Sequence, residues 1–214
     1  MSGAFALLAA AVALSPLPPL PERGLARETS AGVELQTLSG RRLATLPALD
    51  LAPDQTTAHQ LVLRDRRGRL YVLDPMARRL RERPLRHGCR STDVDLLVCA
   101  RTITSRGRVV ARAPGRVGHW LWAEREPGGT AVLAQWEAEC EVPVAYLLAQ
   151  GRRRPYAAES VALGWLAKSE AVIQFPNGPC GGAIHVRGIY AVGGGRMRLL
   201  LRTPRFAQYA MWGG

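Results

Sequence analysis

The stretch from 144 to 153, Val-Ala-Tyr-Leu-Leu-Ala-Gln-Gly-Arg-Arg, contains the pattern that decides the fold. A short apolar run is followed by a turn with glycine and arginine and then by a second strand, which is the pattern of a β-hairpin. Four other segments share this layout, with a turn that contains glycine or a basic residue: 33–42, 70–79, 100–108 and 188–196. A hairpin that recurs five times predicts a protein built from repeated strand units.

Short strands are expected along the rest of the chain as well. Apolar or alternating runs recur between clusters of Gly, Pro, Asp and Arg, and no window after the first 14 residues has the apolar period of an amphipathic helix. Examples of these runs are 69–73, 96–103, 131–136, 142–148, 171–175 and 196–202. Many short strands with frequent turns predict an all-β protein.

A second recurring element precedes the last two hairpins, at 118–123 and 161–166. Its tryptophans Trp122 and Trp165 are 43 residues apart. A unit of about 40 to 45 residues with four strands has the size of a propeller blade. The final segment 209–212, Tyr-Ala-Met-Trp, therefore predicts the first strand of one more unit.

These units resemble the WD40-like β-propeller repeats of TolB-type periplasmic proteins. The segments 143–155 and 188–199 fit the last strand of that repeat, which precedes a turn of glycine and a basic residue. Pro127-Gly128-Gly129 stands where the family has Pro-Asp-Gly, and the turn at 167–170 departs further from it. The resemblance covers 118–212, whereas the earlier chain shares only the hairpins. It implies a β-propeller that acts as an exported binding or protein-interaction scaffold.

The expected fold is a small or incomplete β-propeller of about four to five blades, with a two-sheet β-sandwich as the alternative. An unclosed arc of blades would expose strand edges. Three arrangements remain open: a small ring closed by pairing 209–212 with a strand near Val33, a partial propeller completed by oligomerisation, and a fragment of a longer protein.

The N-terminus is typical of an export leader. The unbroken apolar run from Ala4 to Leu14 is too short to span a bilayer, but its length suits a signal peptide with cleavage near Ala26. No Lys or Arg precedes the run, which leaves a misassigned start as the alternative. We expect a leader at 1–26, a β-propeller-like domain at 27–214, and a secreted or periplasmic protein.

Four cysteines, Cys89, Cys99, Cys140 and Cys180, show no metal-ligand spacing, so the sequence predicts no metal site. The favoured pairing joins Cys89 to Cys99 across two neighbouring strands, with a turn expected at 88–95, and joins Cys140 to Cys180 between two similar segments. Such bonds form outside the reducing cytosol. Four buried free thiols are the alternative.

The sequence contains no motif for a catalytic nucleophile, a zinc helix or a phosphate-binding loop, and we expect neither an enzyme nor a cofactor. The weak site candidates are Glu137, Glu139 and Glu141, because alternation on a strand places all three on one face. Arginines of the next blade are expected to form ion pairs with these glutamates, and likewise with the pair Asp93 and Asp95. Four isolated histidines have no ligand spacing: His59, His87, His119 and His185.

The formal net charge of +12 indicates an anionic partner, and 28 of the 29 basic residues are arginine. The arginine clusters fall at turns and hairpin ends, so they are expected around a rim. The tryptophans recur in strands of the same kind and are expected in the core between blades, which disfavours stacking on nucleic acid. The expected partner is a protein or an anionic cell-surface polymer. An extracytoplasmic hydrolase or lyase with a central carboxylate site, and a basic nucleic-acid or polymer binder, are the alternatives.

Overall fold

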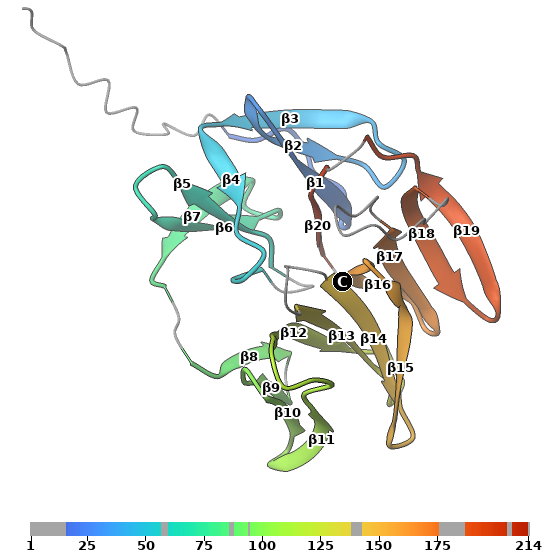
Figure 1. Ribbon diagram of the computed structural model, residues 1–214. Helices are drawn as coiled ribbons and strands as arrows, with labels where there is room; N and C mark the ends of the chain where they lie inside the picture. Colours follow the sequence, from blue (N-terminus) through green and yellow to red (C-terminus); the bar gives the residue numbers. More distant parts are fainter. Residues whose placement is uncertain are drawn as a thin grey trace, which may run out of the picture.

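A computed structural model describes residues 16–56, 60–85, 88–93, 95–137, 143–175, 187–204 and 207–213. It contains twenty strands in five four-stranded antiparallel sheets, and no helix among the described residues. The sheets are arranged around a common axis as the five blades of a propeller (Figure 1). The all-β prediction and the propeller are confirmed, and the two-sheet sandwich is excluded.

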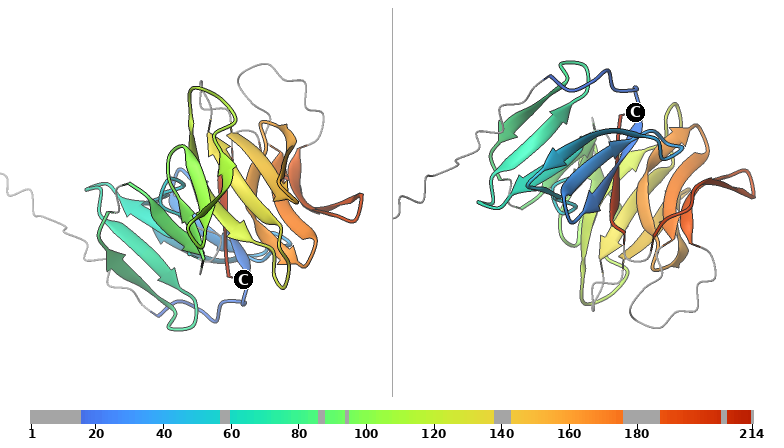
Figure 2. Two further views of the ribbon diagram at one scale, coloured as in Figure 1. Left: turned by 90° about the horizontal axis from the view of Figure 1, so that it is seen from below. Right: turned by 90° about the horizontal axis from the view of Figure 1, so that it is seen from above.

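Blade 1 combines the two ends of the described chain. Its strands, from the inside outward, are β20 (Tyr209–Trp212), β1 (Gly24–Thr29), β2 (Gly32–Gln36) and β3 (Arg42–Pro47). Strand β20 pairs with β1 in register, with Ala210 opposite Ala26, and it runs through the middle of the molecule (Figure 2). Of the arrangements that the sequence left open, the structure has the ring closed by 209–212, and the direct partner is β1, the neighbour of the strand that contains Val33.

Blades 2 and 3 follow in chain order, each as a meander whose first strand is innermost. Blade 2 consists of β4 (Leu49–Leu51), β5 (Val62–Asp65), β6 (Leu70–Asp74) and β7 (Arg79–Arg83). Blade 3 consists of β8 (Arg90–Asp93), β9 (Leu96–Val98), β10 (Thr102–Ser105) and β11 (Arg108–Arg112).

Blades 4 and 5 have longer strands. Blade 4 consists of β12 (His119–Arg125), β13 (Val132–Glu137), β14 (Pro143–Ala149) and β15 (Arg152–Ala158). Blade 5 consists of β16 (Val161–Ala167), β17 (Glu170–Phe175), β18 (Gly188–Gly193) and β19 (Arg196–Leu201).

All five predicted hairpins occupy the same place, because each joins the third strand of a blade to its fourth. Three of the turns have positive φ at both central residues, at Arg106 and Gly107, at Gln150 and Gly151, and at Gly194 and Gly195. This is the type I′ geometry that matches the twist of the flanking strands.

Two expectations for blade 3 were wrong. The run 96–103 is not one strand, because backbone hydrogen bonds between Cys99 and Thr102 close a turn between β9 and β10. The expected turn at 88–95 contains β8, the innermost strand of the blade. A strand of four polar residues, Arg-Ser-Thr-Asp, has no apolar period by which the sequence could reveal it.

Apolar clusters hold most neighbouring blades together. Separate clusters join blade 1 to blade 2, blade 3 to blade 4, blade 4 to blade 5 and blade 5 to blade 1. All five tryptophans are buried in these clusters: Trp120, Trp122, Trp136, Trp165 and Trp212. Their predicted role in the core is confirmed.

The expected domain boundary at residue 26 falls inside β1. Leu25 and Ala26 are fully buried, Leu17 belongs to the core between blades 1 and 2, and the Trp212 indole donates to the carbonyl of Pro21. Residues 17–26 are therefore part of blade 1 and its surroundings. No helix in the described part of the chain is long and apolar enough to cross a membrane.

Candidate functional site

The outer hairpins place pairs of exposed arginines at one end of the ring. Because every blade is an antiparallel meander entered at its first strand, the turn between its third and fourth strands always lies at the same end, which we call the hairpin end. Each hairpin presents two exposed arginines there: Arg41 and Arg42, Arg78 and Arg79, Arg106 and Arg108, Arg152 and Arg153, and Arg196 and Arg198. The predicted placement of charge at the hairpin turns is confirmed, and these five pairs lie at one end of the ring.

Some of these guanidinium groups have partners within their own or a neighbouring blade. Arg198 lies 3.1 Å from Glu170, and Arg42 lies 3.8 Å from Glu34. Arg153 donates to the carbonyl of Arg112 on blade 3 at 2.9 Å. Such exposed pairs are weak and screened by salt, so the rim keeps an excess of positive charge.

The acidic pair Asp93 and Asp95 is used to join blades. The Arg125 guanidinium of blade 4 donates to both carboxylate oxygens of Asp95, and the Arg125 backbone N–H donates to Asp93 at 2.8 Å. Ser105 donates to the same Asp95 carboxylate at 3.1 Å, and the hydrogen bonds and positive charge hold the pKa of Asp95 below its usual range. The prediction that an arginine of the next blade interacts with these two aspartates is confirmed.

Other polar side chains near the inner strands also reach from blade to blade. Glu126 of blade 4 accepts hydrogen bonds from the backbone N–H and hydroxyl of Ser169 on blade 5, at 2.7 and 2.9 Å. Glu28 of blade 1 accepts one from the N–H of Leu51 on blade 2 at 2.9 Å. These groups position the blades, because buried donors and acceptors must be satisfied.

Glu124, on the innermost strand of blade 4, is the titratable group with the most unusual environment. Its pKa is raised to about 8, chiefly by burial and further by repulsion from Asp93, while Arg23 opposes the shift. Sequence reasoning missed this residue. The signal was a single glutamate after the apolar run Trp120 to Ala123, on a strand whose other members are mostly buried.

The three candidate glutamates are described only in part. Glu137 lies at the end of β13, and its carboxylate is 3.4 Å from His119 on the facing strand. Its partner is therefore a histidine of the same blade instead of an arginine of the next. Glu139 and Glu141 lie outside the described residues, as do His59, His87 and His185.

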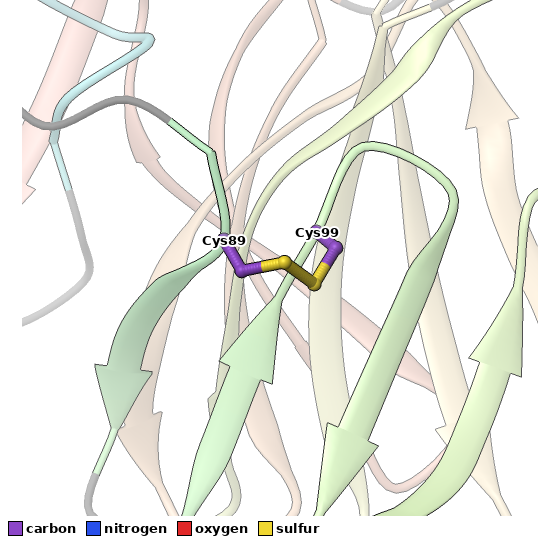
Figure 3. Close-up of a disulfide and its surroundings, with 2 residues drawn as sticks. All are labelled: Cys89 and Cys99. Carbon is purple, nitrogen blue, oxygen red and sulfur yellow. A yellow bond between two sulfur atoms is a disulfide. The ribbon is translucent and has the colours of Figure 1, made fainter.

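One of the two predicted disulfides is present. Cys89, just before β8, is bonded to Cys99, just after β9, with a Cα–Cα distance of 4.1 Å (Figure 3). The pairing across two neighbouring strands is confirmed. Cys140 and Cys180 lie outside the described residues. In the part of the chain that the structure describes, no group of three His, Cys, Asp or Glu side chains is arranged to hold a metal ion.

The aromatic side chains face the core. Trp120 makes edge contacts with Trp136 and Tyr146, at centroid distances of 5.0 and 5.6 Å. The Trp165 indole donates to the backbone carbonyl of Glu124 at 3.2 Å. A single-stranded nucleic acid would need exposed aromatic rings beside the arginines, and the tryptophans do not provide them.

Comparison with the models of known protein families gives no match, and comparison with curated proteins gives none either. The resemblance to TolB-type repeats therefore rests on the hairpin and tryptophan pattern and on the five-blade propeller fold.

Proposed function

We propose that the protein is an exported, non-enzymatic interaction scaffold of the TolB-like, WD40-like propeller type, which binds an acidic protein or an anionic cell-surface polymer. The observation that carries this proposal is the repeated arginine pair at the hairpin end of all five blades. Regularly spaced cations on one face attract a polyanion at long range and bind it by releasing counterions. The Cys89–Cys99 disulfide supports export.

The position of the titratable groups supports a binding role over catalysis. Asp95, Glu126 and Glu28 are all engaged in hydrogen bonds between blades, whereas the arginines of the hairpin end are exposed. An enzyme needs titratable groups that converge on a substrate.

The proposal is tested by removing charge from one end of the ring at a time. The first variant changes Arg41, Arg108 and Arg152 to glutamine, and the matched control changes Arg66, Arg67 and Arg116, which are exposed at the opposite end. Binding of heparin and of fluorescein-labelled polyglutamate is measured by anisotropy against salt concentration. We expect the hairpin variant to lose affinity at least tenfold at low salt and to have a shallower salt dependence, and the control to stay within about twofold of the wild type.

Equal losses in both variants would show that only the net charge matters and would overturn the assignment to the hairpin end. Tight binding of duplex DNA, well above that of heparin at the same salt, would favour the nucleic-acid alternative instead.

A second candidate function rests on Glu124. A carboxyl group whose pKa is raised to about 8 by burial and by a neighbouring aspartate resembles the general acid of glycoside hydrolases. A hydrolase or lyase of this kind would lose its activity in Glu124→Gln while keeping its affinity for polyanions. Unchanged turnover in that variant would show that Glu124 is not the general acid, and a wild type without turnover would remove the enzymatic alternative.

A further inference from the structure

The boundary between blades 2 and 3 differs from the other four, and we call it the seam. Among the described residues, no apolar cluster includes side chains from both of these blades. The apolar residues Ala52, Val62 and Leu70 on the seam side of blade 2 form a small cluster within their own blade. Among the described residues, the strands of these two blades also lie near each other less extensively than the strands at the other four boundaries. The ring is thus closed by strand pairing in blade 1 and loosely packed at the seam.

Blade 3 presents an exposed apolar face to the seam. The register places Ser91, Leu97, Thr104 and Val109 in one row across β8 to β11. The opposite face of the same blade, with Val98 and Ile103, packs against blade 4. Leu97 is 41% exposed and Val109 is 46% exposed.

Leu97 is more exposed than any described residue at the corresponding position, the second strand, of the other four blades. Second strands are protected in a propeller because a neighbouring blade covers each face. Leu97 is the single exposed residue on the five second strands, β1, β5, β9, β13 and β17. Blade 2 therefore does not cover the middle of blade 3.

Blade 2 presents a basic face to the seam. Its register places Arg64 and Arg83 beside the buried Leu70, and Arg81 beside Val72. These side chains lie on the face opposite Leu63 and Leu73, which pack against blade 1. On this face Arg81 lies 2.5 Å from Asp74, and Arg83 donates to Gln60 at 3.3 Å. The seam thus has one apolar wall and one wall with several arginines, whose exposed ion pairs are weak in water.

Near the axis, oppositely charged residues of blades 2 and 3 attract each other across the seam. Burial lowers the pKa of Arg90 on β8, and the attraction of Asp54 on blade 2 partly opposes that shift. Asp54 also lies 2.8 Å from Arg64. The inner ends of the two blades are therefore linked electrostatically, while the outer rows with Leu97 and Val109 remain open.

We propose that the seam binds an extended acidic segment of a partner protein, in which apolar residues alternate with carboxylates. A strand directs alternate side chains to opposite faces. The apolar residues would cover Leu97 and Val109, and the carboxylates would meet Arg81 and Arg83 on the other wall. This inference rests on the proposed function as an interaction scaffold, and it assigns a surface and a partner chemistry to it.

The charges of the seam favour this occupant over two others. A second copy of the chain carries a net charge of +12 and would be repelled by the basic wall. The N-terminal residues 1–15 contain no Asp or Glu, so they offer no partner for the arginines.

The probe for the test is a fluorescein-labelled peptide of four Glu-Val repeats, and its affinity is measured by anisotropy. A peptide with four glutamates followed by four valines has the same composition without the alternation. The seam variant is Leu97→Glu with Val109→Glu. The matched control is Met76→Glu with Met197→Glu, which changes two exposed methionines on blades 2 and 5.

We expect the alternating peptide to bind at least tenfold more tightly than the block peptide, and the seam variant to lose at least tenfold in affinity. The control variant should stay within about twofold. A seam variant with wild-type affinity, or equal binding of the two peptides, overturns the proposal. Leu97→Thr with Val109→Thr, which keeps strand-forming residues, provides the same test with a weaker effect if the charged variant fails to fold.

The hairpin variant of the previous subsection separates the two proposals. Loss of heparin binding in that variant, with peptide binding retained, supports both. If the seam variant still binds the peptide and the hairpin variant does not, the seam proposal fails and the proposed function stands. If neither heparin nor the peptide binds the wild type, both fail. Two further outcomes would overturn the proposal. If the wild type is a dimer and the seam variant is a monomer, the seam binds a second copy of the chain. If the peptide binds only after residues 1–15 are removed, the seam binds that N-terminal segment.

Discussion

Arg125 of blade 4 forms a bidentate ion pair with Asp95 of blade 3, with Nε to Oδ1 at 3.2 Å and Nη2 to Oδ2 at 3.1 Å. The same guanidinium donates to the Ser105 hydroxyl at 2.8 Å. Arg106 also approaches Asp95, at 3.4 Å, but its side chain is 85% exposed. Two arginines thus face one carboxylate in different environments, and they give a matched pair of substitutions.

We predict that Arg125→Gln lowers the thermal midpoint by roughly 3 °C or more, because it removes a bidentate pair and a hydrogen bond at the boundary between blades. Arg106→Gln should leave the midpoint nearly unchanged, because exposed pairs are weak. Thermal unfolding followed by circular dichroism measures both. Equal shifts for the two variants would show that the bidentate geometry contributes nothing.

Glu124 should make the stability of the fold depend on pH. Its pKa is about 8 in the folded protein, above the ordinary glutamate value of 4.5, so the folded state binds the proton more tightly than the unfolded state. Stability should therefore be highest near pH 5 and fall as pH rises toward 8, by about 1 kcal/mol per pH unit. Glu124→Gln mimics the protonated form and should flatten this part of the profile. Urea unfolding of both proteins from pH 5 to 8 is the measurement. If the stability of the two proteins changes with pH in parallel, the prediction is wrong.

The disulfide between Cys89 and Cys99 should stabilise blade 3. Replacing both cysteines by serine should lower the free energy of unfolding by about 3 kcal/mol, since the bond closes a loop with a sequence separation of 10 residues. Urea unfolding with and without a reductant tests this. The urea midpoint of the reduced wild type should approach that of the double variant. If neither reduction nor the substitutions lower the midpoint, the prediction is wrong.

Residues 17–26 should be required for the fold. A chain that begins at Arg27 loses the buried side chains of Leu17 and Leu25, each worth about 2 kcal/mol, and three of the four residue pairs between β1 and β20. We expect it to be unfolded or strongly destabilised, whereas a chain that begins at Pro16 should keep the wild-type midpoint. Mass spectrometry of the folded protein purified from its natural source should accordingly find a first residue before Leu17. An end at Arg27 in a folded protein would contradict this.

Gly24 should tolerate no side chain. A Cβ at this position would meet the ring of Trp212, which is buried on the paired strand β20. Gly24→Ala is therefore expected to cost about 1 to 3 kcal/mol through overpacking. Gly115→Ala is the control, because its nearest neighbour would be the Val117 carbonyl at 3.6 Å. Similar urea midpoints for the two variants would show that the Trp212 ring moves aside freely.

Local patterns were sufficient to predict much of the fold. A turn with glycine and a basic residue between two apolar runs depends on residues that are close in the chain, and all five hairpins were found in this way. The pairing of Cys89 with Cys99 was predictable for the same reason, because the two cysteines flank neighbouring strands. Strand β8 was missed, since its residues are polar and its place is fixed by Thr92, which donates to the Ala123 carbonyl of the next blade at 2.5 Å.

The candidate site was less accessible to sequence reasoning. The arginines were expected around a rim, and their gathering at one end follows only when all five meanders are seen to run in the same direction. The pKa of Glu124 depends on burial by blade 5 and on the charge of Asp93, which is 31 residues earlier in the chain. The residues close to position 124 in the sequence indicate neither its burial nor the nearby charge.

The sequence by itself determined the β class and the hairpin repeat, and it indicated that 209–212 forms the first strand of a further unit, because each follows from residues adjacent in the chain. Only the tertiary structure decided that residues 17–26 belong to the ring, that blade 1 unites the two ends of the described chain, and that blades 2 and 3 meet at an open seam. These features depend on which faces of distant strands cover one another, and exposure of a residue such as Leu97 is a property of its neighbours in space.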